Sequence, residues 1–396
     1  MKRKIVDLNI FIPLYCMILA FAGCNDTEIN ISNKVEGDLV KQAYYKLPRN
    51  SIYNGYKVVT SIDTAIQATS EKCLMQNLKN LNAEYGCVIV METSTGKINA
   101  LVNLSKTDSC TYQDRLNHAV CSTIELGSLL HIYDVMQLLE DHYVDTSTVV
   151  DYKGKYVFNE NTVTDNHILD LDSISLSNAF IYSSKTVFAK EINKYYSEKP
   201  AFFQKDFKKL GFDKKLDIPF ESQGISNIST PLDKNWSNNS LVYQSIGYEI
   251  SISPIQILTF YNAIANQGEM VKPLFLSQIT NEKGQKKVYK KEVLQPKICS
   301  DKTLKKLQAL LEKTVSEGSS TCAYSNKIKI AGKQATIIDL KAPHQTTNDY
   351  YSAFVGYFPS DKPKYTAIVV VYKPSDFYYG ISGRIFTEIA NGLNIN

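Results

Sequence analysis

One short segment constrains this chain more than any other, Glu125-Leu126-Gly127-Ser128-Leu129-Leu130-His131. Gly127 ends a small turn and delivers Ser128 to the start of an apolar run with helical spacing, Ile132, Val135, Met136 and Leu139. A hydroxyl there lies where the free N–H groups and dipole of a helix favour negative charge. One turn later, on the same face, stands His131. The pattern predicts a nucleophilic serine with a histidine at the position of a base; the alternative is a serine that only caps the helix.

The order of helical and strand-like patterns predicts the fold. Helical apolar spacing over residues 61–81 is followed by two strand-like runs, 86–92 and 97–104, which the turn at 93–96 joins into a hairpin. Further helices are predicted at 128–139, 176–195, 253–268 and 301–316, then strands at 327–331, 335–340, 351–358 and 364–372 and a last helix at 385–393. Strands at both ends with helices between predict one sheet, assembled from distant segments and covered by helices, in one large domain.

Composition excludes several classes of function. The net charge of +4 over 396 residues contains no long basic run, so no nucleic acid partner is implied. Histidines and cysteines lack metal-ligand spacing and no glycine-rich phosphate loop is present, so we expect neither a metal nor a cofactor. A disulfide such as Cys110–Cys121 stays open.

The N-terminus has the pattern of an export signal. A basic head at residues 2–4 precedes an apolar run at 8–22, and small residues stand directly before Cys24. This pattern resembles a bacterial lipoprotein signal, so we expect residues 1–24 to be the signal and Cys24 to be lipidated. The alternative is an uncleaved membrane anchor, but the run is short for a span of about 20 residues and contains an asparagine and a proline. Residues 25–56 are polar and predict a tether.

Two further segments could bring chemistry to Ser128. Ser183-Ser184-Lys185 lies in a helical region downstream, and Gly332-Lys333-Gln334-Ala335-Thr336 lies at a strand start near the C-terminus. Either segment alone is a weak signal, because serines often cap helices and lysines at strand ends are usually solvated. The order of the three segments along the chain gives them meaning together.

In this order the three segments resemble the S-x-x-K, S-x-N and K-T-G motifs of the transpeptidase domain of penicillin-binding proteins, class B in particular. The flanks are similar as well: TSIDTAIQ at 60–67, VMETSTGKINA at 90–100, NHAV at 117–120, QSIGY at 244–248, SPIQ at 253–256, ANQG at 265–268, FVGYFP at 354–359 and YG at 379–380. The resemblance covers residues 57–396. It implies an α+β fold in which a mainly antiparallel sheet lies between helices, with a helical subdomain.

The resemblance also implies roles for these residues. In the family the serine attacks the D-Ala-D-Ala end of a peptidoglycan stem peptide, or a β-lactam ring, and forms an acyl-enzyme; here that serine is Ser128. Ser183 opens the second motif, and Lys333 would bind the substrate carboxylate. The backbone N–H groups of Ser128 and Thr336 would form the oxyanion hole. The substrate would lie along the strand at Gln334 and Ala335.

Three motif positions depart from the family. His131 replaces the lysine that takes the serine proton, Lys185 replaces the asparagine, and Gln334-Ala335 replaces Thr-Gly, where an added Cβ should obstruct substrate. The simpler interpretation is a decayed centre, since losing a positioned base costs about 10²–10⁴ in rate. The other is a rewired centre, in which neutral His131 acts as base or Lys185 approaches Ser128.

We therefore predict a cell-envelope lipoprotein, anchored in the membrane by its lipid, with an impaired D,D-transpeptidase-like domain that acts in peptidoglycan synthesis or remodelling. One alternative is a non-catalytic module that binds wall peptides or scaffolds other cell-wall synthesis proteins. The other is a β-lactam sensor or β-lactamase-like protein. Binding of a stem peptide and of β-lactams is implied by the resemblance.

Overall fold

A computed structural model describes residues 38, 50–53, 55–220, 222–339, 342, 349–374 and 380–393. The predicted signal segment with Cys24, most of the tether, and Tyr379 lie outside these residues. Within the described ranges, none of the helices combines the length and apolar character that a bilayer crossing requires.

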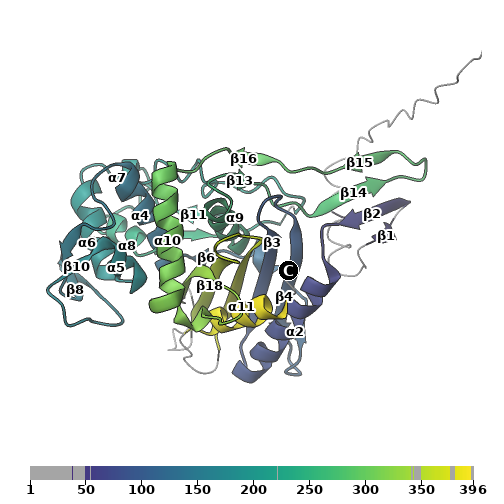
Figure 1. Cartoon of the computed structure of the whole chain (residues 1–396), viewed down its shortest axis with the longest axis horizontal. Helices are drawn as coiled ribbons and strands as arrows, with labels where there is room; N and C mark the ends of the chain where they lie inside the picture. The colour runs from purple at the N-terminus through teal and green to yellow at the C-terminus, as the bar shows by residue number, and fades with distance from the viewer. Residues whose placement is uncertain are drawn as a thin grey trace, which may run out of the picture.

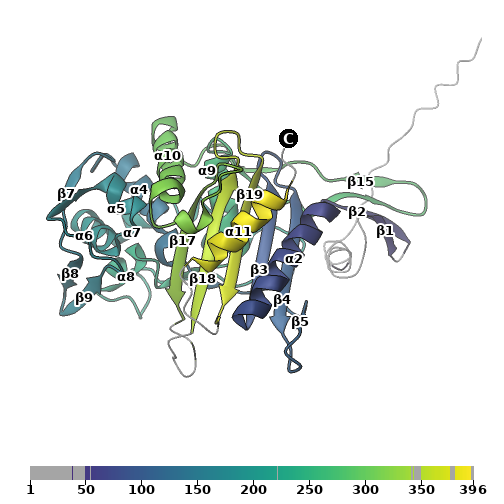
Figure 2. The same ribbon diagram turned by 60° about the horizontal axis from the view of Figure 1, so that its bottom comes forward.

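A six-stranded sheet forms the centre of the molecule (Figure 1). Its strands follow the order β17-β18-β19-β3-β4-β5 (Figure 2). All its neighbouring strands are antiparallel. The strands are β3 (Tyr85–Glu92), β4 (Ile98–Lys106), β5 (Tyr112–Gln113), β17 (Ala331–Ile338), β18 (Tyr350–Phe358) and β19 (Tyr365–Tyr372). The pairing of β19 with β3 joins the two ends of the domain. The predicted sheet of distant segments is thus confirmed.

Helices cover both faces of this sheet. Figure 2 shows α2 (Thr64–Leu81) and α11 (Ile381–Gly392) lying across one face, where they enclose an apolar cluster with the sheet. On the other face α9 (Pro254–Ala265) contacts β18 and β19 within the larger apolar cluster. The α+β fold with an antiparallel sheet between helices is confirmed.

A helical lobe packs beside β17, at one end of the sheet (Figure 2). Its helices are α4 (His131–Glu140), α5 (Leu176–Ile181), α6 (Lys185–Tyr196), α7 (Pro200–Phe203), α8 (Ser240–Ser245) and α10 (Asp301–Glu317); the short α3 (His118–Cys121) lies nearer the sheet. The single helix predicted at 176–195 is wrong, because it breaks into α5 and α6. Ser183 adopts a left-handed φ of 62°, and Ser184 caps α6 by accepting a bond from Val187 N–H.

Shorter strands make the remaining structure. A four-stranded sheet has the order β1-β2-β14-β15, a three-stranded one β11-β12-β6, and three pairs are β13 with β16, β7 with β10, and β8 with β9. Their bounds are β1 (Asn50–Tyr53), β2 (Tyr56–Thr60), β6 (Ile124–Glu125), β7 (Val149–Asp151), β8 (Lys155–Phe158), β9 (Asn161–Thr164), β10 (Ser173–Ser175), β11 (Asn227–Ile228), β12 (Ile250–Ile252), β13 (Met270–Val271), β14 (Leu276–Thr280), β15 (Lys286–Val288) and β16 (Val293–Gln295), and the two 3₁₀ helices are η1 (Gly127–Leu129) and η2 (Thr321–Ala323).

Two details differ from the sequence-based expectations. The strand predicted at 327–331 is wrong: Ser325 Oγ accepts bonds from the N–H groups of Lys327 and Ile328, at 3.0 and 3.3 Å, and holds this stretch as a turn before β17. Cys110 and Cys121 are not bonded to each other, so the disulfide left open does not form.

Candidate functional site

Backbone contacts place Ser128 at the start of the helical lobe. The N–H groups of Leu126 and Gly127 donate to the carbonyl of Gly247 at 3.0 and 3.1 Å. Gly247 has a φ of +82°, and a Cβ on it would lie 2.2 Å from backbone atoms of Gly127. Only glycine therefore fits there. Tyr261 Oη adds a bond to the carbonyl of Leu129 at 2.9 Å. Ser128 itself is half-buried and stays within reach of solvent.

The second motif is held by Asp165, in the loop after β9. This carboxylate accepts bonds from Ser184 Oγ at 2.6 Å and from the N–H of Thr186 at 2.9 Å. The bonds fix the turn in which Ser183 adopts its left-handed conformation. Lys185 Nζ donates to Asn166 Oδ1 at 2.9 Å, so this amine is engaged at the edge of the lobe.

The third motif supplies a buried amine. Lys333 lies in β17 with no exposed surface, and its Nζ donates to Ser183 Oγ at 2.8 Å and to the carbonyl of Gln334 at 3.2 Å. Ser319 Oγ lies 3.5 Å from the same nitrogen. Burial lowers the pKa of Lys333 to about 7, because removal from water disfavours the charged amine. The second and third motifs are thus directly bonded.

The Ser128 segment packs against both of the others. η1 lies along β17, where a Cβ on Gly127 would come within 2.8 Å of Ile337 Cγ1. At the start of α4 the His131 ring stacks on Phe188 of α6, with centroids 4.4 Å apart. The three segments picked out from the sequence therefore converge on one site.

His131 is fully buried, and neither of its ring nitrogens has a hydrogen-bond partner. Burial, and then the positive charges of Lys333 and Lys185, hold its pKa well below the usual histidine range. The ring is neutral at pH 7 and makes no bond to Ser128 in this geometry. In many enzymes the catalytic hydrogen bonds form only once the substrate has bound. The missing bond between His131 and Ser128 therefore describes the site without substrate.

The residues after Lys333 alternate across β17. The Gln334 side chain is buried on the opposite face from the amine, where it donates to Ser352 Oγ at 3.1 Å and accepts from the N–H of Gly383 at 3.2 Å. Ala335 returns to the face of Lys333 and is buried in the larger apolar cluster. A substrate that lies along β17 beside Gln334 would therefore contact the backbone of this residue and not its side chain.

The free edge of β17 fits the predicted oxyanion hole. The N–H of Gln334 points away from β18 and donates to Ser320 Oγ at 2.9 Å. In an antiparallel strand the N–H two residues later faces the same side, which places that of Thr336 on the open edge. The role of this N–H stays a prediction.

Sequence reasoning missed the residues that support the site. Asp165 and Ser320 had no recognisable signal, since each acts on a segment distant in sequence. Gly247 had one, because it lies in the QSIGY stretch that resembles the family. Among the described residues no group of three or more histidine, cysteine, aspartate or glutamate side chains could hold a metal ion.

Comparison with known proteins agrees with this geometry. Residues 86–391 match the penicillin binding protein transpeptidase domain. A probable peptidoglycan D,D-transpeptidase PenA of Neisseria flavescens is 26% identical over 365 residues, which cover 88% of this chain and 85% of that protein. The peptidoglycan D,D-transpeptidase FtsI of Buchnera aphidicola is 24% identical over 84% of this chain, which spans only 58% of the relative's length.

Solved structures share the fold. The transpeptidase domain of penicillin-binding protein 3 from Burkholderia pseudomallei superposes with a TM-score of 0.71 at 23% identity, over 85% of this chain and 96% of that one. Penicillin-binding protein 3 of Mycobacterium tuberculosis, solved with aztreonam, gives 0.74 at 19% identity, over 86% and 80%. With Lys333 bonded to Ser183, η1 packed along β17 and a family match over most of its length, the chain belongs to the penicillin-binding protein transpeptidase domain family.

Proposed function

We propose that this chain is a lipid-anchored envelope protein whose domain, residues 57–396, binds peptidoglycan stem peptides and transfers their acyl group slowly. The observation that carries the proposal is the 2.8 Å bond between Lys333 Nζ and Ser183 Oγ, at the site where η1 presents Ser128. A buried amine, a hydroxyl and a half-exposed serine are the groups that acyl transfer through a serine needs.

The chemistry would begin with attack of Ser128 Oγ on the carbonyl of the D-Ala-D-Ala bond. Neutral Lys333 could receive the serine proton by way of Ser183 and return it to the departing D-alanine amine. The strand edge at Thr336 supports the proposal, since an N–H there can bind the oxyanion.

The rate should be low because the family's usual base is missing. His131 stands in its place without a hydrogen bond from either ring nitrogen, and Lys185 is bonded to Asn166 instead of facing Ser128. Loss of a positioned base costs about 10²–10⁴ in rate. These observations also favour a second candidate, a module that binds wall peptides without chemistry.

A fluorescent penicillin tests the proposal. We expect wild-type protein to be labelled covalently over hours, Ser128→Ala to abolish the label, and the exposed control Ser109→Ala to leave it unchanged. If high penicillin concentrations give no label on wild type, acyl transfer is refuted. Binding of a D-Ala-D-Ala peptide that persists equally in wild type and Ser128→Ala would then support the non-catalytic module.

The lipid anchor is a separate proposal, supported by the small residues before Cys24 and the polar stretch after it. Cells grown with radiolabelled palmitate should label the wild-type chain and not Cys24→Ala. The Cys110→Ala variant is a matched control, because that cysteine is exposed and free in the folded domain. Label that remains on Cys24→Ala would refute the anchor.

A further inference from the structure

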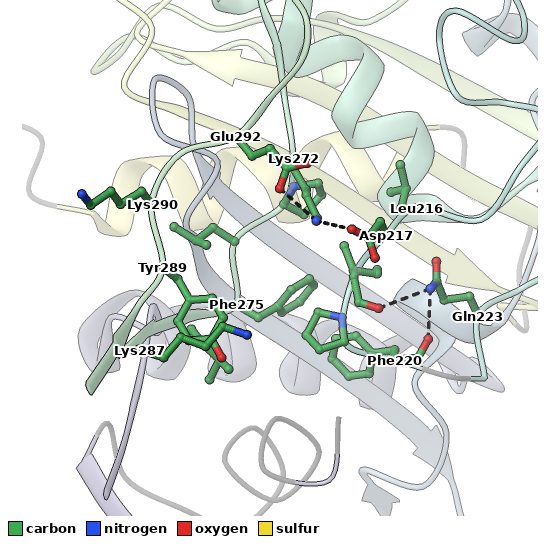
Figure 3. A pocket seen from close by; sticks show the side chains of 15 residues that line it. Leu216, Asp217, Phe220, Gln223, Lys272, Phe275, Lys287, Tyr289, Lys290 and Glu292 are labelled. Atoms are coloured by element: carbon green, nitrogen blue, oxygen red, sulfur yellow. Dashed lines mark hydrogen bonds and ion pairs between the residues drawn. The ribbon is translucent and has the colours of Figure 1, made fainter. Parts of the chain in front are cut away.

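A cavity of about 500 Å³ lies outside the acyl-transfer site (Figure 3). Its walls come from three segments: residues 216–220 with Gln223, residues 272–276, and the stretch from Lys287 to Glu292. None of the three motif segments contributes to it. The size falls within the range of about 300–1,000 Å³ in which proteins bind ligands.

The floor of the cavity is apolar and partly aromatic. Phe220 and Phe275 meet edge to face with centroids 4.9 Å apart, and Ile218 and Leu276 lie beside them. Each of these four side chains is at most 7% exposed, so the floor is a fixed part of the core. Such a floor accepts an apolar or aromatic group from outside.

Polar contacts hold the walls in place. Lys272 belongs to the second wall segment, and its Nζ lies 2.6 Å from Asp217 of the first and 3.0 Å from Glu292 of the third (Figure 3). These ion pairs hold the three segments together. The lysine side chain is 19% exposed, while those of the two acids are 89% and 58% exposed. Gln223 Nε2 donates to the carbonyl of Phe220 at 3.0 Å and fixes the loop. The cavity is therefore formed before any ligand binds.

Positive charge is concentrated beside the cavity. The arm at residues 282–291 carries five lysines and one glutamate, and one of these lysines, Lys291, is paired with Glu269 outside the arm. Two of these lysines, Lys287 and Lys290, line the cavity. Complementary charge next to an apolar pocket favours a partner that is both acidic and apolar.

We propose that this cavity docks an acidic peptide segment of a partner protein. One apolar or aromatic side chain of the peptide enters the cavity against Phe220 and Phe275, and its acidic neighbours lie along the arm. A flat anionic membrane fits less well, because it would press against the exposed carboxylates of Asp217 and Glu292. A peptide can turn its backbone N–H groups toward those acids.

The test uses the full chain and a short fluorescein-labelled peptide with one central phenylalanine flanked by glutamates, read by fluorescence anisotropy. We expect this peptide to bind, and peptides with a central alanine, or with lysines in place of the glutamates, to bind at least about tenfold more weakly. Leu274→Trp, at a half-buried position of the lining, should fill the cavity and weaken binding to the same degree.

Charge reversal on the arm offers a matched control. The double variant Lys287→Glu/Lys290→Glu should weaken binding about tenfold. Lys283→Glu/Lys286→Glu makes the same charge change on the same arm outside the lining, and should change binding less than about threefold. Unchanged thermal unfolding midpoints show that the variants fold. Ser128→Ala should bind the peptide as wild type does, so the result is independent of acyl transfer.

Four outcomes overturn the proposal. No peptide binding, or equal binding of the phenylalanine and alanine peptides, would show that the cavity takes no side chain. Equal losses in the two double variants would show only general attraction to polyanions. Binding to phosphatidylglycerol vesicles without binding to the peptide would assign the arm to a membrane.

Discussion

If the proposed acyl transfer occurs, the pH dependence of penicillin labelling will show which group is its base. Lys333 is fully buried and bonded to Ser183, and burial lowers its pKa to about 7. His131 has a pKa held well below its usual range, so its ring stays neutral across the neutral pH range. The two candidate bases therefore predict different profiles.

The size of the effect follows from the titration of Lys333. With a pKa of about 7, about one tenth of the amine is neutral at pH 6 and about nine tenths at pH 8. If neutral Lys333 receives the proton, the second-order acylation rate should rise roughly ninefold from pH 6 to pH 8. If the amine is needed only as a cation for the substrate carboxylate, the rate should fall over the same interval.

The assay is stopped-time labelling with a fluorescent penicillin between pH 5.5 and 9, at concentrations far below saturation. A rate that rises with a midpoint near pH 7, and a variant Lys333→Met that is labelled slowly at every pH, would support the amine as base. A flat profile between pH 6 and 8 would refute it and return the role to His131.

Burial of Lys333 also predicts a lower free energy of unfolding at pH 7. An unfolded lysine, with its usual pKa of 10.5, binds a proton between about pH 7 and 10.5 where native Lys333 does not, so stability should rise with pH across this window. The lowered pKa corresponds to a penalty on the order of a few kcal/mol, larger than the roughly 1 kcal/mol contributed by each hydrogen bond lost. Lys333→Met should therefore be more stable than wild type at pH 7, measured by urea unfolding. An equal or lower unfolding free energy would contradict the shift.

Three further variants and one control variant test the support of the site. Ala335→Gly removes the methyl group that faces the Lys333 side of β17, and should speed penicillin labelling several-fold while costing about 1 kcal/mol in urea unfolding; unchanged labelling would contradict the obstruction. Gly247→Ala, whose Cβ would meet Gly127 at 2.2 Å, should cost at least about 2 kcal/mol and abolish labelling, whereas Gly284→Ala, at φ +76° with no atom within 4 Å, should show the conformational cost alone. Burial raises the pKa of Asp134 well above its usual value, so its unfolded form loses a proton that the native form keeps. The stability of wild type relative to Asp134→Asn should therefore fall as the pH rises above about 4, and parallel curves would refute this.

The fold could be predicted from the sequence wherever local patterns decide it. The helix α9 begins at Pro254, as the Ser253-Pro254 pair predicts, and Ser253 and Gln256 form a capping box. The break between α5 and α6 could not be predicted, because apolar spacing continues through it. The turn depends on bonds from Asp165, which is distant in sequence.

The contact between the motif segments could be predicted from the sequence, whereas the catalytic roles of their residues stay predictions. The order of the three motif segments along the chain predicted that they meet. Because side chains alternate between the two faces of a strand, Gln334 and Lys333 are expected on opposite faces of the sheet. The isolation of His131, stacked on Phe188 without a partner, depends on tertiary packing that no local pattern encodes.

The helix that begins with His131 shows that the backbone contacts that hold Ser128 are separate from the polar side chains beside it. Three polar residues of α4, His131, Asp134 and Gln137, are fully buried, and five of their side-chain atoms have no hydrogen-bond partner. Unpaired buried polar groups cost stability, and a chain keeps them mainly where function requires them. The contacts that present Ser128 are made by backbone atoms of Gly127 and Gly247, and they do not depend on these side chains. A different residue at position 131 therefore leaves the serine in place, and under the proposed function reactivity depends on neutral Lys333.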